Sequence, residues 1–284
     1  LPEATLESIR RNRVALKGPL TTPVGMGFRS INVTLRELFD LYANVRPVVS
    51  MPGTHSRFDG VDIITVRENT EGAYLAADAL LSEDGNTAES KMVITRKGSE
   101  RVTRYAFELA RRTSRRKVTL VHKANILKTV SGLFLDVSRE VAKDYPDIEC
   151  AEMIVDATCM KLVMDPQLFD VIVTTNLFGD IISDLCAGLV GGLGLAPGAN
   201  IGKEVAIFEA VHGSAPDIAG RKIANPCALL LTAVQMLSHL EMQEQADRLH
   251  GAITNTIAER DRITPDLAGN GNTDSFADAI ISRL

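Results

Sequence analysis

The sequence predicts an α/β fold in which helices cover both faces of a sheet. Short runs rich in valine and isoleucine alternate with longer stretches whose apolar residues recur at helical spacing. The pair Asn225-Pro226 is typical of a helix start, and it precedes the apolar stretch 227–240. The expected strands are 61–66, 118–121, 171–174 and 205–208, and the expected helices include 102–110 and 127–141.

Composition limits what the protein can bind. The 284 residues are 45% hydrophobic, which suffices for one large or two medium domains. A net charge of −5 gives no bulk attraction to nucleic acid or to an anionic membrane, and glycines interrupt the apolar run 185–195. An anionic substrate would therefore need local arginines. The segment 76–90, which is rich in acids and contains Gly85 and Asn86, breaks the alternation and indicates an excursion from the sheet.

The four cysteines, Cys150, Cys159, Cys186 and Cys227, show no zinc-ligand spacing. We expect buried thiols in a reducing compartment. The first residue is Leu1 rather than methionine, so we also expect that a natural N-terminal segment precedes this sequence.

Two aspartates form a candidate metal site. Asp180 and Asp184 are four residues apart at an expected helix start, which places both carboxylates on one face, about 6 Å apart along the axis. Hard oxygen ligands suit Mg²⁺ or Mn²⁺. The alternative is that acids in a first turn only complement the helix dipole. The apolar surroundings predict that these acids are buried, and buried acids need a partner or a metal.

Three arginines indicate an acidic substrate. Arg36, Arg46 and Arg67 each lie near the end of a separate element. A guanidinium can bind a carboxylate through two parallel hydrogen bonds, which lysine does less specifically. Each arginine alone could form a surface ion pair. Together with the aspartate pair they predict a pocket for a substrate with several carboxylates.

These motifs, in this order, resemble the β-decarboxylating dehydrogenases, the family of isocitrate, 3-isopropylmalate and homoisocitrate dehydrogenases. Ser30 and Asn32 resemble the isocitrate branch, because the isopropylmalate branch has apolar residues there to meet an isopropyl group. The motifs that carry the resemblance are 17–47, 67–72 with Tyr74, 121–125, Asp156, 176–184 and 209–217.

The resemblance implies a three-layer αβα sandwich of the isopropylmalate dehydrogenase type rather than a Rossmann fold. The glycines at 192–194 agree, because Pro197 takes the third position of a dinucleotide fingerprint and the stretch does not join a strand to a helix. The family's opening strand and glycine-rich loop are not found in this sequence. The implied parts are a large domain of 1–41 and 191–284, a small domain of 42–71 and 96–190, and a clasp-like dimerisation segment of 72–95.

The resemblance also implies the residues of the site, an NAD cofactor, a Mg²⁺ or Mn²⁺ ion, and a homo-oligomer whose catalytic unit is a dimer. Tyr74 would protonate C3 after decarboxylation, and Lys123 of the partner subunit would move protons at the substrate hydroxyl. From the residues alone, Tyr74 could be a core tyrosine and Lys123 a solvated strand end. The implied metal ligands are Asp180, Asp184 and the partner's Asp156. The implied substrate-binding residues are Lys17, Ser30, Asn32, Arg36, Arg46 and Arg67, and the implied cofactor-binding residues are Thr21, Asn32, Asn125, His212, Gly213, Ser214, Ala215, Asp217, Ile218 and Asn225.

The cofactor prediction depends on two positions. Asp217-Ile218 stands where NADP-using relatives carry a lysine and a tyrosine that grip the 2′-phosphate, and 264–269 lacks their tyrosine and arginine. A carboxylate can accept hydrogen bonds from ribose hydroxyls and would repel a phosphate, which favours NAD. Arg221-Lys222 is the opposing observation, since these cations could meet a phosphate.

The resemblance thus implies oxidative decarboxylation of isocitrate to 2-oxoglutarate with NAD. Two alternatives stay open: homoisocitrate or 3-isopropylmalate dehydrogenase, and a non-catalytic regulatory subunit of a hetero-oligomeric isocitrate dehydrogenase. The complete set of implied site residues favours catalysis. The expected compartment is the bacterial cytoplasm, or the mitochondrial matrix if the protein is eukaryotic.

Overall fold

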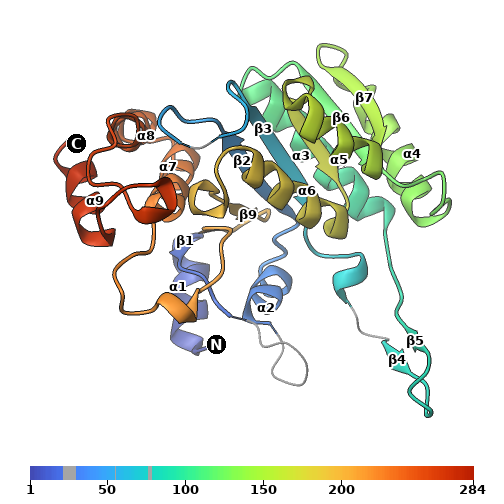
Figure 1. Ribbon diagram of the computed structural model, residues 1–284. Coiled ribbons are helices and arrows are strands. Elements are labelled where there is room, and N and C mark those ends of the chain that lie inside the picture. The colour runs from blue at the N-terminus through green and yellow to red at the C-terminus, as the bar shows by residue number, and fades with distance from the viewer. Residues whose placement is uncertain (22–29, 55, 76–78) are drawn as a thin grey trace. The chain divides into compact units, whose positions relative to one another are not determined.

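The computed structural model describes residues 1–21, 30–54, 56–75 and 79–284 (Figure 1). The chain forms two compact units. Unit 1 contains Leu1–Phe39, Arg46–Asp62 and Asp184–Leu284, and unit 2 contains Asp40–Val45 and Ile63–Ser183. Among the described residues, no helix is both long and apolar enough to cross a membrane. The domain ranges that the resemblance implies stay a prediction.

Unit 2 is built on four parallel strands in the order β3-β8-β6-β7. The central strands β8 and β6 consist of buried β-branched and apolar residues almost throughout, as expected of a parallel sheet covered on both faces. The strands are β3 (Asp62–Glu68), β6 (Lys117–His122), β7 (Glu149–Ile154) and β8 (Val171–Thr174).

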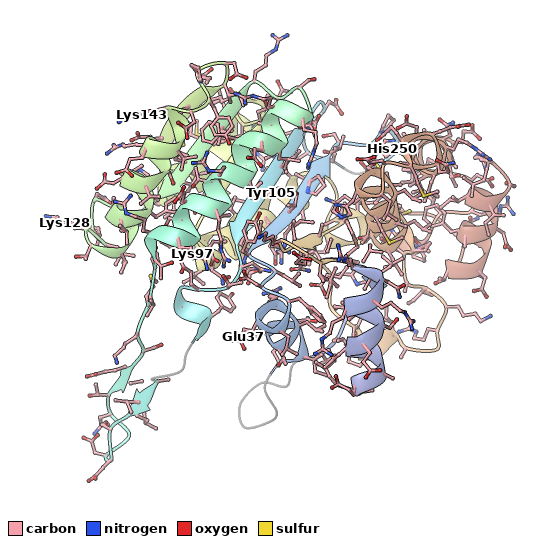
Figure 2. The ribbon with its side chains drawn as sticks, turned by 180° about the vertical axis from the view of Figure 1, so that it is seen from behind. Glu37, Lys97, Tyr105, Lys128, Lys143 and His250 are labelled. Atoms are coloured by element: carbon pink, nitrogen blue, oxygen red, sulfur yellow. The ribbon has the colours of Figure 1, made fainter. Side chains whose placement is uncertain are left out.

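Helices lie on both faces of this sheet, so the unit has three layers. In Figure 1, α5 and α6 lie in front of the strands. The reverse view in Figure 2 has α3, which carries Tyr105, in front of the strands, with α4 beside it between Lys128 and Lys143. The helices are α3 (Arg96–Arg112), α4 (Val130–Ala142), α5 (Val155–Met164) and α6 (Asn176–Leu189), with the short turn η2 (Pro166–Leu168). This arrangement confirms the predicted αβα sandwich.

The predicted excursion from the sheet is a hairpin in unit 2. Its strands β4 (Leu80–Leu81) and β5 (Ala88–Glu89) pair antiparallel, and they extend away from the sheet in Figure 1. The hairpin follows the short turn η1 (Ala73–Leu75), and residues 76–78 lie outside the described part of the chain. Leu80 and Leu81 are both exposed. Two adjacent exposed leucines are unusual on an edge strand.

Unit 1 carries a smaller group of strands. β1 (Val14–Lys17) pairs parallel with β10 (Ala206–Glu209), and β10 pairs antiparallel with β9 (Ala199–Ile201). The remaining elements of this unit are α1 (Glu3–Asn12), α2 (Ile31–Leu38), η3 (Leu193–Leu195), η4 (Pro216–Ile218), α7 (Cys227–His239), α8 (Gln243–Ala258), η5 (Pro265–Leu267) and α9 (Thr273–Ile281). Three elements, β2 (Ala43–Val49), β3 and α6, have residues in both units.

The core of unit 1 lies among α7, α8 and α9. Phe276, Ile253 and Cys227 are almost fully buried in it. The predicted start of α7 is confirmed, because the Asn225 side chain accepts a hydrogen bond from the Cys227 N–H at 2.9 Å. Gly53 shows how closely the chain packs here. It has a positive φ of 87°, and a Cβ at this position would lie 2.4 Å from the Ile257 carbonyl oxygen of α8.

Most predicted elements are confirmed within one or two residues, but four expectations need correction. The helix expected at 102–110 begins earlier, at Arg96, where the Thr95 side chain caps α3. The helix expected at 127–141 begins only at Val130, because residues 124–129 form turns in which the N–H groups of Ile126 and Leu127 bond to the Lys123 carbonyl. Cys186 and Cys227 are buried, whereas Cys150 is exposed because it lies on β7, the edge strand of unit 2. Cys159 is partly exposed.

A buried ion pair joins the last residues of β1 and β10. Lys17 and Glu209 are register partners, and their side chains form a salt bridge while only 18% and 11% exposed. Burial alone raises the pKa of Glu209, but the Lys17 and Arg36 charges and the Asn200 hydrogen bond outweigh it. The pKa of Glu209 therefore lies below its ordinary value. Because the pKa is depressed in the folded state, the pair stabilises the fold above the ordinary carboxyl pKa and loses this contribution as the pH falls.

We expect Glu209→Gln to lower the free energy of unfolding at pH 7 by about 1–3 kcal/mol, because it leaves the Lys17 ammonium buried without a counter-charge. The gap between parent and variant should stay constant down to about pH 5 and shrink below pH 4.5, where the parent's carboxylate becomes protonated. Urea unfolding between pH 3.5 and 7 measures this gap. The exposed pair Arg13–Glu204 provides the control Glu204→Gln, for which we expect almost no change. Equal effects of the two substitutions would show that the buried Lys17–Glu209 pair does not stabilise the fold more than an exposed pair does.

Candidate functional site

The predicted site residues of unit 2 gather where parallel strands end. Arg67 lies near the end of β3, Lys123 directly follows β6, and Asp180 lies on α6, the helix that begins two residues after β8. The carboxyl ends of parallel strands lie at one edge of a sheet, which is where open α/β sheets bind their ligands. Within this edge the side chains form two clusters.

The first cluster contains Arg67, Tyr74 and Asp180. Arg67 is a charged residue with only 1% of its surface exposed, and its Nη1 donates to Asp180 Oδ1. The Tyr74 hydroxyl donates to Asp180 Oδ2, and the Arg67 guanidinium carbon lies 5.1 Å from the centre of the Tyr74 ring. A predicted substrate arginine, a predicted catalytic tyrosine and a predicted metal ligand are thus in direct contact.

The loop that follows Arg67 is held by its own acidic residues. Glu68 accepts hydrogen bonds from the backbone N–H groups of Thr70 and Glu71, both at 2.9 Å. The Glu71 carboxylate accepts from the N–H and the hydroxyl of Thr95, the residue that caps α3. Burial raises the pKa of Glu71. Both glutamates therefore shape the loop that carries Tyr74.

The second cluster of unit 2 is the ion pair of Lys123 with Asp156, which begins α5. The hydrogen bond from Lys123 holds the pKa of Asp156 below its ordinary value. The backbone here is fixed by two side chains. The Lys123 N–H donates to Ser131 Oγ at 2.7 Å, and the Ala124 N–H donates to His122 Nδ1 at 3.1 Å. Burial lowers the pKa of His122, which keeps its ring neutral and able to accept. Asn125 lies exposed in the same turn.

In unit 1, the predicted substrate residues lie on β1 and α2. Ser30 caps α2, and its hydroxyl accepts from the Val33 N–H at 3.5 Å. Arg36 is in the last turn of this helix, where its charge acts on Glu209. Within the described part of the chain, no donor meets the buried Oδ1 of Asn32. A buried amide oxygen without a donor suits a residue that binds a ligand. Residues 22–29 of the same motif lie outside the described residues.

Arg46 and Asp184 form another pair within unit 1. Arg46 lies on β2 and is largely buried, and its Nη1 donates to Asp184 Oδ1 at 3.1 Å. Asp184 is on α6, one turn beyond Asp180. Each of the two aspartates that were predicted to bind a metal therefore accepts a hydrogen bond from an arginine that was predicted to bind substrate.

The predicted cofactor residues of unit 1 form a loop around η4 and the start of α7. The Thr21 and Ser214 hydroxyls share a hydrogen bond, and His212 Nδ1 lies 2.9 Å from the Gly213 carbonyl. Ala215 has a positive φ of 44°, a conformation that alanine rarely adopts, and it leads into η4 with the exposed Asp217. Ile218, at the end of η4, is only partly exposed.

The neighbouring Asn225 donates from Nδ2 to Asp266 Oδ2 at 2.9 Å. Gly194 approaches this pair closely, since a Cβ on it would lie 3.2 Å from Asp266 Oδ2. Lys222 pairs with Asp274 at 2.6 Å. The structure thus places one more carboxylate beside a predicted cofactor residue and shows a partner for one of the two opposing cations.

The aspartate carboxylates of α6 are suitable ligands for a hard divalent cation. Asp180 and Asp184 lie in the second and third turns of the helix, so the expected position at the helix start is wrong, as is the helix-dipole alternative. Their side chains are 32% and 54% exposed, so the expected burial of Asp184 is also wrong, because this part of α6 faces outward. Carboxylates with this access suit Mg²⁺ or Mn²⁺. Among the described residues of the single chain, no three acidic, histidine or cysteine side chains are grouped closely enough to hold an ion.

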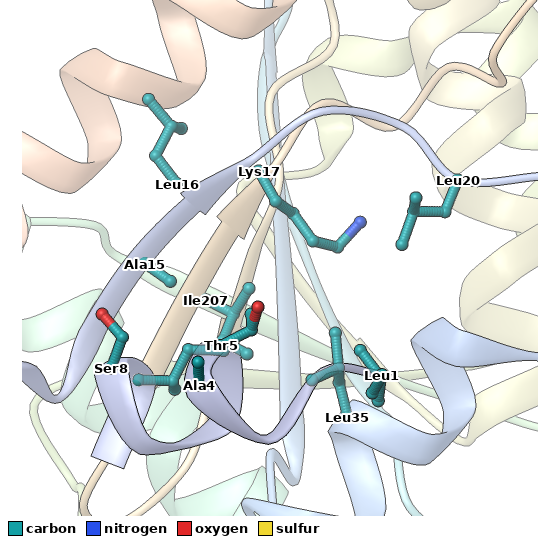
Figure 3. Close-up of a pocket in the computed structure, with 11 residues that line it drawn as sticks. Leu1, Ala4, Thr5, Ser8, Ala15, Leu16, Lys17, Leu20, Leu35 and Ile207 are labelled. Carbon is teal, nitrogen blue, oxygen red and sulfur yellow. The ribbon is translucent and has the colours of Figure 1, made fainter. Parts of the chain in front are cut away.

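A cavity of about 490 Å³ opens beside Lys17 in unit 1. Figure 3 shows Lys17 and Leu16 leaving β1 in opposite directions, with Leu35 of α2 and Ala4 of α1 below them. Among the described lining residues, most are aliphatic, and Lys17 supplies the one charged side chain. This lining does not match a substrate with several carboxylates.

Three residues that contact the predicted site were not assigned a role from the sequence. Glu209 pairs with Lys17, Asp266 with Asn225, and Asn176 accepts from Arg67 Nε at 3.0 Å and Nη2 at 2.7 Å. A signal for Glu209 existed, because it directly follows the predicted strand 205–208. Asn176 opens the metal motif, but nothing in the sequence alone pairs it with an arginine 109 positions earlier.

Comparisons with known proteins show the family of the chain. A family profile described as isocitrate/isopropylmalate dehydrogenase matches residues 1–280. Catalytic subunit 5 of the mitochondrial NAD isocitrate dehydrogenase of Arabidopsis thaliana is 55% identical over 281 residues, covering 99% of this chain and 75% of that protein. The chloroplastic 3-isopropylmalate dehydrogenase of Solanum tuberosum is 55% identical over 255 residues, covering 89% of this chain and 71% of that protein.

The fold has a close match among solved structures. The crystal structure of isocitrate dehydrogenase from Methylococcus capsulatus superposes with a TM-score of 0.96 at 58% identity, covering 100% of this chain and 85% of that chain. With these likenesses along nearly all of its length, the chain belongs to the isocitrate/isopropylmalate dehydrogenase family.

Proposed function

We propose that this protein oxidises and decarboxylates isocitrate to 2-oxoglutarate and CO₂, with NAD as the hydride acceptor and a divalent cation. The observation that carries the proposal is the cluster of Arg67, Tyr74 and Asp180, in which groups for binding a carboxylate, moving a proton and holding a metal touch one another. Ser30 and Asn32, the polar pair that resembles the isocitrate branch, support isocitrate over an alkyl-substituted malate.

The arginines of the site bind the substrate. Arg36, Arg46 and Arg67 supply three guanidinium groups, and Lys17 and Ser30 add an ammonium and a hydroxyl. Isocitrate carries three carboxylates. A guanidinium is always protonated and matches a carboxylate with two parallel N–H groups, so these residues hold the substrate in one orientation.

Two groups complete the chemistry when bound. Asp180, Asp184 and Asp156 of a partner subunit would hold a divalent cation, which would supply Lewis acidity at the 2-hydroxyl oxygen of the substrate, the atom that becomes the carbonyl oxygen. The predicted cofactor-binding residues would hold NAD, which would supply the acceptor for the hydride of C2.

The proton steps belong to Lys123 and Tyr74. Lys123 of the partner subunit, in its neutral amine form, takes the proton of the substrate hydroxyl, and the resulting ammonium pairs with Asp156. Tyr74 gives a proton to C3 after CO₂ leaves. Its hydroxyl already donates to Asp180, so the proton lies next to a metal ligand. The hydrogen bonds of Glu68 and Glu71 hold the loop that carries Tyr74.

An exposed apolar surface on α5 supports assembly with a partner subunit. Met160 and Met164 are exposed, and they lie on the same helix face as Asp156, at intervals of four residues. Ile181 on α6 and the hairpin residues Leu80 and Leu81 are exposed as well. Exposed apolar side chains that recur on one helix face, as Met160 and Met164 do on α5, are typical of protein interfaces. We propose a dimer in which this face of each subunit carries Lys123 and Asp156 into the partner's site.

Two alternatives keep specific support. The Solanum relative is named a 3-isopropylmalate dehydrogenase, which supports that substrate, whereas Ser30 and Asn32 oppose it. A relative from Dictyostelium discoideum, 46% identical over 285 residues, is named a regulatory subunit of NAD isocitrate dehydrogenase, which supports a hetero-oligomer, whereas the Arabidopsis relative is named a catalytic subunit. The complete set of catalytic, arginine and aspartate residues favours a catalytic chain. The mitochondrial name of that relative favours the mitochondrial matrix over the bacterial cytoplasm as the compartment.

We expect turnover of isocitrate with NAD and Mg²⁺ or Mn²⁺, and slower turnover of homoisocitrate and 3-isopropylmalate. Asp184→Asn should lower kcat/KM by at least about 100-fold, because it weakens the binding of a metal ion that would stabilise charge in the transition state. Asp136→Asn, at an exposed acid of α4 paired with Arg139, is the control and should leave the rate unchanged. Initial rates at saturating metal test both substitutions. Near-normal rates of Asp184→Asn, with its unfolding midpoint unchanged, would show that the metal assignment is wrong.

Acidic residues near the predicted adenosine site support NAD over NADP. Asp217 is exposed on η4, and Asp266 lies next to Asn225. Carboxylates here favour ribose hydroxyls and repel a 2′-phosphate. Lys222, the cation that could have met a phosphate, pairs with Asp274.

The parent should prefer NAD to NADP in kcat/KM by at least about tenfold, which corresponds to about 1.4 kcal/mol. The double substitution Asp217→Lys with Ile218→Tyr should shift this ratio toward NADP, because it replaces a repulsive charge with an attractive one. Asp278→Lys, an equal charge change on α9, controls for net charge. Equal use of the two cofactors by the parent would overturn the assignment.

A further inference from the structure

Arg67 is a buried charge held by a socket on α6. Its side chain leaves β3 and meets Asn176, Gly179 and Asp180, all in the first five residues of the helix. Removing an ion from water is costly unless hydrogen bonds replace its hydration. The shape of this socket therefore determines where the guanidinium lies.

Asn176 supplies a neutral acceptor to one edge of the guanidinium. Its Oδ1 accepts from Arg67 Nε at 3.0 Å and from Nη2 at 2.7 Å. Its Nδ2 donates to the Glu71 carbonyl at 2.8 Å, which fixes the amide so that the oxygen faces Arg67. Because Asn176 is uncharged, it orients the guanidinium without neutralising the charge that a substrate carboxylate would meet.

Gly179 supplies the space for the aliphatic part of Arg67. A Cβ on Gly179 would lie 2.5 Å from Arg67 Cγ and 2.6 Å from Arg67 Cβ, far inside van der Waals contact. Gly188 lies on the same helix, and apart from its chain neighbours and the helix's own backbone, none of the described residues has an atom within 4 Å of a Cβ built on it. The requirement for glycine at 179 thus comes from Arg67 rather than from the helix.

We propose that Asn176 and Gly179 are positioning residues for substrate binding. Asn176 holds the Nε–Nη2 edge of Arg67, and Gly179 lets the stem pass close to α6, so that Nη1 is directed toward Asp180 and Tyr74. This inference rests on the proposed function, in which Arg67 binds a carboxylate of the substrate. It adds two residues that touch neither substrate nor cofactor and act through Arg67.

Kinetics of matched alanine variants test the proposal. Alanine in place of glycine raises helix propensity at either position, so Gly179→Ala and Gly188→Ala differ mainly in the contact with Arg67. We expect Gly179→Ala to raise KM for isocitrate at least tenfold, with a smaller loss in kcat, and Gly188→Ala to match the parent. Asn176→Asp keeps the shape but adds a charge, and it should also raise KM tenfold or more. Arg67→Lys, which changes the substrate-binding group itself, should give the largest increase in KM of these variants. Unfolding midpoints identify any variant that fails to fold.

A spectroscopic signature tests the positioning without any substrate. Arginine Nε–H groups exchange rapidly with water unless they are buried and hydrogen-bonded. We expect one slowly exchanging Nε–H signal in ¹H–¹⁵N spectra, assigned to Arg67 by its loss in Arg67→Lys. It should persist in Gly188→Ala and be lost or exchange at least tenfold faster in Asn176→Ala and Gly179→Ala.

The outcomes separate this inference from the proposed function. If the parent turns over isocitrate but Gly179→Ala and Asn176→Asp have the KM of the parent, the positioning roles are wrong and the function stands. If the parent neither binds nor oxidises isocitrate, the proposed function fails together with the substrate-binding role of Arg67, and the Nε–H signal still decides whether Asn176 and Gly179 hold the side chain. An unprotected Arg67 Nε–H in the parent would overturn the socket itself.

Discussion

A buried guanidinium is the constraint on which the candidate site depends. Arg67 has almost no contact with solvent, so its charge must be met by protein groups, and α6 supplies them. This requirement brings the start of α6 against β3 and places a glycine where the two approach. It also brings Tyr74 over the guanidinium. The same contacts that stabilise the buried charge therefore assemble the groups proposed to bind and protonate the substrate.

In both units, oppositely charged side chains pair at the ends of parallel strands. Lys17 and Glu209 end two neighbouring strands in unit 1, and their ion pair is largely withdrawn from water. In unit 2, Lys123 follows β6 and pairs with Asp156, the acid that follows β7. Side chains at such ends converge because parallel strands end at one edge, and the helix that follows each strand supplies further ligands. The contacts also sort the residues of unit 2 into two clusters, one around Arg67 and one around Lys123.

The sequence predicts the sandwich, the strands β3, β6, β8 and β10 and the family, because periodicity and motif order are local and strong signals, but it does not predict β1, β2, β7 or β9. It does not predict contacts that depend on packing. The exposure of Asp184 follows from the direction in which α6 faces, and the exposure of Cys150 from the position of β7 at the sheet edge. The pairing of Asn176 with Arg67 joins residues far apart in the chain, so neither residue type nor spacing could reveal it. The same holds for Asp266 beside Asn225, where the family resemblance marked only one member of the pair.

The central claim is that each catalytic site combines the Arg67 cluster of one subunit with the Lys123 cluster of another. Mixing a Tyr74→Phe subunit with a Lys123→Met subunit, each inactive alone, tests it most directly. In a mixed dimer one site carries both lesions and the other carries none, so purified mixed dimers should recover about half of the parental activity. The mixing should be verified with differently tagged subunits. Verified mixed dimers that stay as inactive as their parents would contradict the shared site, because each chain would then carry its own Tyr74 and Lys123 into the same site.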